Sequence, residues 1–173
     1  MASIRQALLG QSRAKSDKPL RILVPIGGDD LDAHLLNYVC KIAKKQSSFI
    51  TMIYVVEVDQ ALPLDMDLPA DVTRGETVLQ RAQGAVMQDL DVKTCSINTD
   101  LLQARLAGPA IVDEAVMQDA DAIIMSARVT KRLGKRTIGD TVDYVLKNAP
   151  CEVVLLRAAM PENLMHELEM DLE

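Results

Sequence analysis

The stretch that decides the fold is Arg21-Ile-Leu-Val-Pro-Ile26, followed directly by Gly27-Gly28-Asp29-Asp30. A short apolar run that ends in glycine and aspartate is typical of a buried strand that turns into the start of a helix. After the turn, apolar residues recur at the spacing of one helical face, with lysines on the opposite face. They are Leu35, Leu36, Val39, Cys40 and Ala43. The segment therefore predicts a strand, a turn and a helix, the first part of a parallel α/β unit.

The same alternation continues to residue 156. Apolar runs predict further strands at residues 49–56, 92–98, 122–125 and 151–156. Amphipathic stretches between them predict three helices: one begins with a capping box at residues 73–76, one opens with Gly108-Pro109, and one follows Thr137. Strands that alternate with helices pair in parallel through right-handed crossovers. We therefore expect an α/β fold with an open, doubly wound, five-stranded parallel sheet.

Length and composition indicate one core with short tails. The chain has 173 residues, of which 49% are hydrophobic, and this is enough to bury one substantial core. Residues 1–19 mix basic and small polar residues and are interpreted as a tail or linker. The acidic residues 158–173 are interpreted as a tail or a short amphipathic helix. We therefore assign the α/β domain to residues 20–157.

Charge, aromatic content and apolar runs narrow the partners and the location. A net charge of −6 and an aromatic content of 2% argue against nucleic acid as a partner. No apolar run reaches the length of a membrane span, and no signal-peptide cleavage site follows the short apolar stretch near Met1. The three cysteines, Cys40, Cys95 and Cys151, form no C-x-x-C pair and are expected to be core thiols without disulfides or zinc. We therefore expect a cytoplasmic protein without a transmembrane segment.

A basic loop follows the fourth expected strand, at the end of the sheet where parallel α/β folds bind ligands. Residues 126–141 contain five cations within nine positions: Arg128, Lys131, Arg132, Lys135 and Arg136. The helix that follows offers free N–H groups, a favourable dipole and the hydroxyl of Thr141. The cations of the loop and the start of the helix therefore favour phosphate binding independently of each other. The other interpretation, a solvated basic loop without a ligand, stays open.

Structural roles explain the remaining glycine, aspartate and histidine residues better than ligand binding, metal binding or catalysis does. Gly27 and Gly28 would let a ligand approach the backbone, but their favoured role is to make the turn. The three aspartates at positions 29, 30 and 32 are favoured as helix caps over a metal site. His34 and His166 have no nucleophile or second histidine nearby and are interpreted as surface residues. We therefore predict no catalytic residue and no metal ligand, and do not expect an enzyme.

Several segments together resemble the universal stress protein family, whose fold is of the adenine nucleotide alpha hydrolase-like type. The resemblance covers residues 20–157, and its strength lies in the order and spacing of the segments rather than in any one of them. It implies the five-stranded fold expected above. The matching segments are Ile22-Leu-Val-Pro-Ile26, Gly108-Pro-Ala110, Asp121-Ala-Ile-Ile-Met125, Gly139 and Asn148-Ala-Pro-Cys-Glu-Val-Val-Leu-Leu156.

The resemblance also implies a site, and the sequence departs from its pattern. Nucleotide-binding members carry a glycine, two residues, a glycine, nine residues, and a glycine followed by serine or threonine. Aligned on Gly139, this chain has Ser126 and Val129 at the first two glycines and Asp140 at the hydroxyl position. An aspartate there repels a phosphate. The family's adenine-contacting aspartate falls on Gly27, and Val55 matches a position of backbone contact to adenine.

The predicted ligand-binding residues combine both lines of argument. The expected ligand is an adenine nucleotide or another phosphorylated molecule, with ATP, AMP and a cyclic dinucleotide as candidates. The set is Gly27, Gly28, Val55, Ser126, Arg128, Lys131, Arg132, Lys135, Arg136, Gly139 and Thr141.

Family members commonly dimerise through their last strands, which implies an interface at Val153, Val154, Leu155 and Leu156. The expectation is therefore a homodimeric, nucleotide-binding regulatory module of the stress response. The alternative is a ligand-free dimeric interaction protein, including a cytoplasmic regulatory part or partner of a membrane transporter. A nucleotide hydrolase is disfavoured because no general base, nucleophile or metal cluster is visible.

Overall fold

A five-stranded parallel sheet forms the centre of the computed structural model, which describes residues 18–90 and 95–159. The strand order is β3-β2-β1-β4-β7, and each neighbouring pair is parallel. The strands are β1 (Leu20–Pro25), β2 (Ser48–Glu57), β3 (Cys95–Ala104), β4 (Ala122–Ala127) and β7 (Glu152–Arg157). The predicted fold class is thereby confirmed. The tails expected at both ends lie almost wholly outside the described residues.

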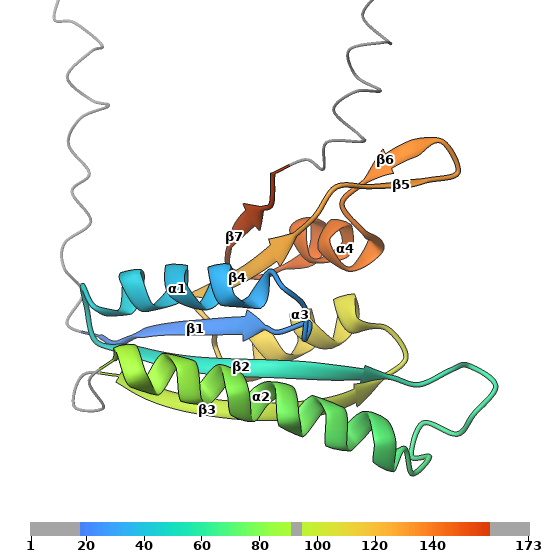
Figure 1. Ribbon diagram of the computed structural model, residues 1–173, viewed down its shortest axis with the longest axis horizontal. Helices are drawn as coiled ribbons and strands as arrows, with labels where there is room; N and C mark the ends of the chain where they lie inside the picture. The colour runs from blue at the N-terminus through green and yellow to red at the C-terminus, as the bar shows by residue number, and fades with distance from the viewer. Residues whose placement is uncertain (1–17, 91–94, 160–173) are drawn as a thin grey trace, which may run out of the picture.

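Helices cover both faces of the sheet (Figure 1). On one face lie α1 (Asp32–Ala43) and α2 (Pro69–Asp89), and on the other lie α3 (Ala107–Met117) and α4 (Asp140–Asn148). Helices α1, α2 and α3 each connect two parallel strands directly, and α4 leads into β7, as crossover connections require. The sheet is therefore doubly wound.

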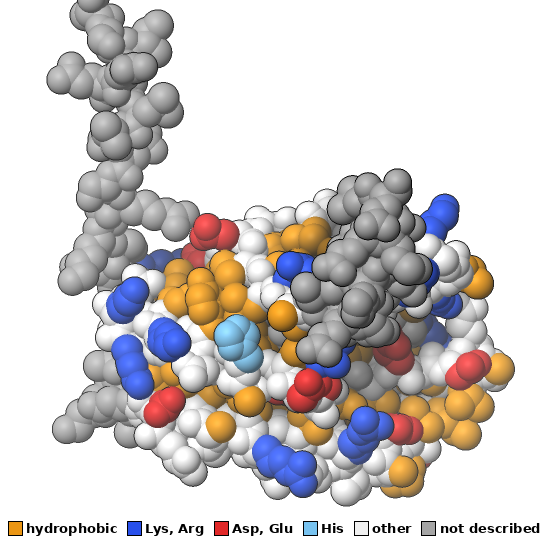
Figure 2. Space-filling view, turned by 45° about the horizontal axis from the view of Figure 1, so that its top comes forward, with side chains coloured by type: hydrophobic (Ala, Val, Ile, Leu, Met, Phe, Trp, Pro, Cys, Tyr) orange, Lys and Arg blue, Asp and Glu red, His pale blue; other side chains and the backbone are white. Residues whose placement is uncertain are grey.

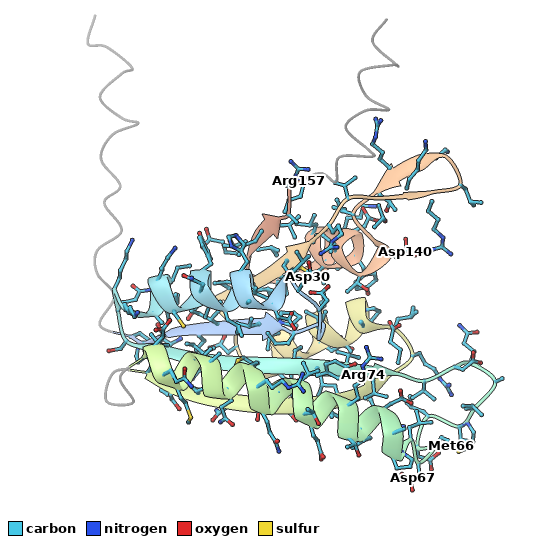
Figure 3. The ribbon with its side chains drawn as sticks, viewed as in Figure 1. Asp30, Met66, Asp67, Arg74, Asp140 and Arg157 are labelled. Atoms are coloured by element: carbon cyan, nitrogen blue, oxygen red, sulfur yellow. The ribbon has the colours of Figure 1, made fainter. Side chains whose placement is uncertain are left out.

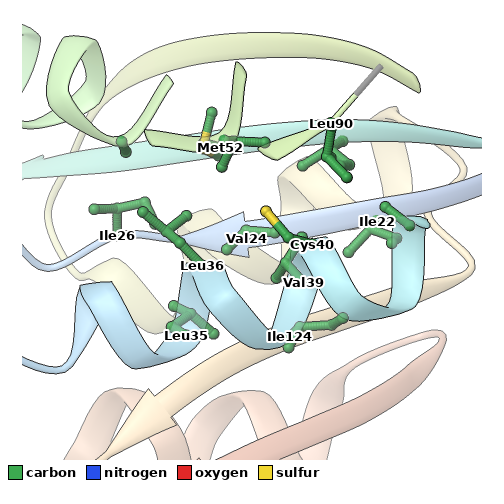
Figure 4. Close-up of a cluster of buried hydrophobic side chains, with 14 of the residues drawn as sticks. Ile22, Val24, Ile26, Leu35, Leu36, Val39, Cys40, Met52, Leu90 and Ile124 are labelled. Carbon is green, nitrogen blue, oxygen red and sulfur yellow. The ribbon is translucent and has the colours of Figure 1, made fainter. Parts of the chain in front are cut away.

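Two apolar clusters fill the space between the sheet and its helices. Ile22 and Val24 of β1 pack with α1 and α2, while Leu23 between them packs with α3 and α4. Figure 4 shows the first cluster. Successive strand side chains point to opposite faces, so a strand covered on both sides has to be apolar throughout. All five apolar residues predicted for the face of α1 are buried.

Two predicted boundaries are wrong. No helix begins at a capping box at residues 73–76, because α2 already begins at Pro69, a residue suited to a first helical turn. Strand β3 does not end at Asn98 but pairs with β2 as far as Ala104. Its outer part carries exposed polar residues, which an apolar-run criterion does not detect.

The basic loop contains regular structure that was not predicted. β5 (Thr130–Arg132) and β6 (Lys135–Thr137) form an antiparallel hairpin that projects from the body of the domain (Figure 1). Leu133 and Gly134 form its two-residue turn, with φ of 50° and 77°. We refer to residues 130–137 as the cationic hairpin.

Close packing of α2 on the sheet requires a glycine at one position. A Cβ atom on Gly75 would lie 2.6 Å from Cδ1 of Tyr54 and 2.7 Å from Cδ1 of Leu101. Gly84, in the same helix, has no such neighbour within 4 Å.

We expect Gly75→Ala to lower the free energy of unfolding by about 1–3 kcal/mol, because the added methyl group overpacks this contact. The control, Gly84→Ala, should raise it by about 0.5–1 kcal/mol through the better helix propensity of alanine. Urea denaturation followed by circular dichroism measures both. Equal effects of the two substitutions would contradict the predicted packing.

Candidate functional site

A cleft of about 470 Å³ opens at the carboxyl ends of β1, β2 and β4. The order of the sheet reverses here: β2 lies on one side of β1 and β4 on the other, and the connections that follow β1 and β4 run to opposite faces. Parallel α/β folds bind ligands at such a point. Four of the predicted site residues line the cleft: Gly27, Val55, Ser126 and Thr141.

The other two predicted glycines shape the surroundings. Gly139 has a φ of 95° and stands at the N-cap of α4, two residues before Thr141. Gly28 has a φ of 79°, and a Cβ atom there would lie 2.9 Å from Cγ2 of Val78. Both positions favour glycine for conformational reasons. The role of Gly28 in making the turn is therefore supported by its geometry.

Aspartates hold the turn after β1 through its backbone amides. Asp32 accepts hydrogen bonds from the amides of Gly27 at 3.1 Å and Gly28 at 2.7 Å. Asp29 accepts one from the amide of Leu31 at 2.9 Å. The predicted capping role is thus wrong in detail, because α1 has Leu31 at its N-cap and no side-chain cap. These carboxylates fix the loop before the helix and so define one wall of the cleft.

The cleft is acidic. Asp29, Asp32, Glu57 and Asp71 line it, and no lysine or arginine of the described part of the chain does. Glu57 also accepts a 2.7 Å hydrogen bond from the amide of Ala107, at the start of α3. Sequence reasoning missed Glu57 and Asp71. The position of Glu57 at the end of a central strand, beside the switch point, was the available signal for it.

The five cations of the basic loop do not gather around this cleft. Arg128 instead pairs with Asp30: its Nη2 donates to both carboxylate oxygens, at 2.6 and 2.7 Å, which lowers the pKa of that carboxyl. The remaining four lie on the cationic hairpin, where Nη1 of Arg132 is 3.6 Å from Oδ2 of Asp140. Figure 3 shows Asp30 and Asp140 on separate elements. The basic loop is therefore divided between an ion pair and a projecting hairpin.

No histidine or cysteine of the described residues lines the cleft. His34 is exposed on α1 (Figure 2), and His166 lies outside the described residues. The three cysteines are free, with Cys40 and Cys95 buried and Cys151 half-buried. Burial raises the pKa of the Cys40 and Cys151 thiols, which disfavours the reactive thiolate. In residues 18–90 and 95–159, no helix is long and apolar enough to cross a membrane.

An open parallel sheet with a cleft at its switch point defines a doubly wound α/β domain. The chain belongs to the universal stress protein family, whose family model matches residues 20–157. It is 27% identical over 146 residues to a universal stress protein of Methanocaldococcus jannaschii, and the match covers 82% of this chain and 84% of the relative. The resemblance inferred from the sequence is confirmed.

Solved structures of the family share the fold. A universal stress protein of Archaeoglobus fulgidus in complex with dAMP has a TM-score of 0.61 at 16% identity, covering 79% of this chain and 96% of that chain. A family protein of Arabidopsis thaliana with AMP bound has a TM-score of 0.58 at 11% identity, covering 84% of this chain and 95% of that chain. At such identities the likeness shows the fold alone.

Half-burial of Asp32 makes the free energy of unfolding of the protein depend on pH. Burial raises the pKa of this carboxyl above its ordinary value of 3.8, although the hydrogen bonds from Gly27 and Gly28 act in the opposite direction. Between the two pKa values the folded chain binds more protons than the unfolded chain. The contribution of Asp32 to stability is therefore fully present below the unfolded pKa and is lost as the pH rises through the folded pKa.

Asp32→Asn cannot ionise and should not show this loss. We expect the free energy of unfolding of the wild type, minus that of Asp32→Asn, to fall as the pH rises from about 4 and to level off above the raised pKa. Urea denaturation from about pH 4 to about pH 7 gives both values. A difference that grows with pH would show that the amide hydrogen bonds outweigh burial.

Proposed function

We propose that this chain is a regulatory module that binds an adenine nucleoside monophosphate in the cleft beside β1 and β4. The observation that carries the proposal is the position of the cleft at the switch point, with Gly27, Val55, Ser126 and Thr141 in its walls. The nucleotides bound by the Archaeoglobus fulgidus and Arabidopsis thaliana proteins support an adenine ligand.

The acidic wall suits the nucleoside part of such a ligand. Ribose hydroxyls and the adenine amino group are hydrogen-bond donors, and ionised carboxylates are acceptors. Asp29, Glu57 and Asp71 offer such acceptors along the cleft. Charge-assisted hydrogen bonds of this kind are stronger than neutral ones. The same carboxylates repel additional phosphate groups, so a monophosphate should bind better than ATP.

The phosphate would lie towards the start of α4. Its first turn offers free backbone N–H groups, and the hydroxyls of Ser126 and Thr141 face the same cleft. Asp140 opposes an anion here, which again limits the favourable number of phosphates. Nη2 of Arg128 is already held by Asp30. The hairpin cations Lys131, Arg132, Lys135 and Arg136 therefore contribute mainly long-range attraction, which salt weakens.

Calorimetric titration with AMP, ADP, ATP and cyclic dinucleotides tests this proposal. We expect AMP to bind, ATP to bind more weakly, and Thr141→Val to weaken AMP by roughly tenfold or more through the loss of a hydrogen bond to a charged group. Thr130→Val, on the exposed hairpin, is the matched control. Arg128→Ala and Arg136→Ala should change the affinity less than Thr141→Val does. If no nucleotide of the panel binds, the ligand-free interaction protein becomes the better interpretation.

We further propose that the module is a homodimer that pairs through β7. This strand is at the edge of the sheet, and its half-buried residues Val153, Val154, Leu155 and Leu156 make that edge apolar. An apolar edge strand is prone to pair with another chain. The same proposal includes regulation through such a dimer, a cytoplasmic location and the lack of catalysis. A membrane-transporter partner belongs to the ligand-free alternative. The departures at Val129 and Asp140 favour the ligand-free dimer as the second candidate.

Leu155→Lys places a charge in this edge and should convert dimers into monomers. Analytical ultracentrifugation at micromolar concentration measures the change, and thermal unfolding checks that the variant is folded, because Leu155 also packs against the core. Lys147→Gln, on the exposed surface of α4, is a control that should remain dimeric. A wild-type protein that sediments as a monomer would refute the dimer.

A further inference from the structure

The cationic hairpin presents positive charge on both of its faces. Lys131 pairs across the hairpin with Arg136, and Arg132 pairs with Lys135. Neighbouring residues of a strand point to opposite sides, so the two cross-strand pairs lie on opposite faces. All four residues are exposed, and the hairpin projects from the domain (Figures 1 and 3). The chain as a whole carries a net charge of −6, which is opposite in sign to the charge of the hairpin.

The sequence of the hairpin works against its own stability. Like charges directly opposite each other in an antiparallel pair are destabilising, and the hairpin contains two such pairs. Its turn needs two positive φ angles, for which asparagine or glycine is preferred. Leu133 occupies the first of these positions with a φ of 50° and an exposed fraction of 97%. Packing in the isolated domain does not explain the exposed leucine.

We propose that the cationic hairpin docks on anionic lipid membranes, with Leu133 inserted among the lipids. An apolar group at the tip with cations behind it matches the two forces that bind a peripheral protein to such a surface, apolar burial and attraction to anionic headgroups. Headgroups around an inserted tip neutralise both faces at once and remove the cross-strand repulsion. None of the four hairpin cations lines the cleft.

The projecting shape favours a lipid surface over an acidic protein. A convex tip enters a bilayer surface without a shaped receptor, whereas a protein would need a groove that is acidic on both walls and apolar at its floor. The contact between Arg132 and Asp140 is a weak obstacle, because its side chains are 77% and 94% exposed. The net charge of −6 should keep the rest of the molecule away from the membrane, so the hairpin would approach first.

Cosedimentation with lipid vesicles in about 0.1 M NaCl tests the proposal. The protein should bind vesicles of phosphatidylcholine and phosphatidylglycerol in a ratio of about 3:1 and should not bind phosphatidylcholine alone. Removing two cations in Lys131→Gln/Lys135→Gln should weaken binding about 25-fold, at about fivefold for each charge. The matched control is Lys44→Gln/Lys45→Gln, at exposed lysines that follow α1, and it should bind like the wild type.

Leu133→Asn separates insertion from simple charge attraction. Asparagine suits the turn better than leucine, so the hairpin should remain formed, yet vesicle binding should fall by at least about tenfold because the buried apolar side chain is lost. A soluble polyglutamate provides the acidic-protein arm. Polyglutamate binding as tight as vesicle binding, or vesicle binding unaffected by Leu133→Asn, would overturn the proposal. The assay contains no nucleotide, so its result is independent of the proposed cleft ligand.

Discussion

Strand β1 pairs with β2 along one edge and with β4 along the other, so its side chains must be covered on both faces. Burial of Ile22 and Val24 towards α1 and α2, and of Leu23 towards α3 and α4, meets this requirement. The connections that leave β1 and β4 run to opposite faces of the sheet. The chain segments that follow these two strands therefore separate, and a cleft remains between them. The packing of one apolar strand thus determines where the candidate site lies.

Charge is divided between two separate places in this molecule. Carboxylates line the cleft, with Asp32 fixing the turn after β1, while the cations that follow β4 are drawn off into the pair Arg128–Asp30 and the cationic hairpin. This separation is consistent with a cleft that recognises the donor groups of a nucleoside and a hairpin that meets anions elsewhere.

The sequence predicted the sheet and the buried face of α1, because apolar periodicity is a local and strongly constrained pattern. The four predicted residues that line the cleft came instead from the expected loops and from the family resemblance. Sequence reasoning missed the hairpin, since strands made of lysine, arginine and threonine show no apolar alternation and Leu133-Gly134 is an unusual turn. It placed the start of α2 at Thr73 rather than at Pro69, because residues 73–76 have the pattern of a capping box. Asp71 was missed because only folding brings it to the cleft, whereas Glu57 could have been predicted from its position at the end of a central strand.

The central claim is that the cleft between the ends of β1 and β4 is the ligand site. The most direct test is a ¹⁵N NMR titration of the protein with AMP, followed through the backbone amides. Shifts concentrated at Gly27, Val55, Ser126 and Thr141, which line the cleft, are the predicted result. Shifts concentrated instead in the hairpin, residues 130–137, or at Arg105 and Leu106 just before α3, would contradict the claim and place any nucleotide elsewhere.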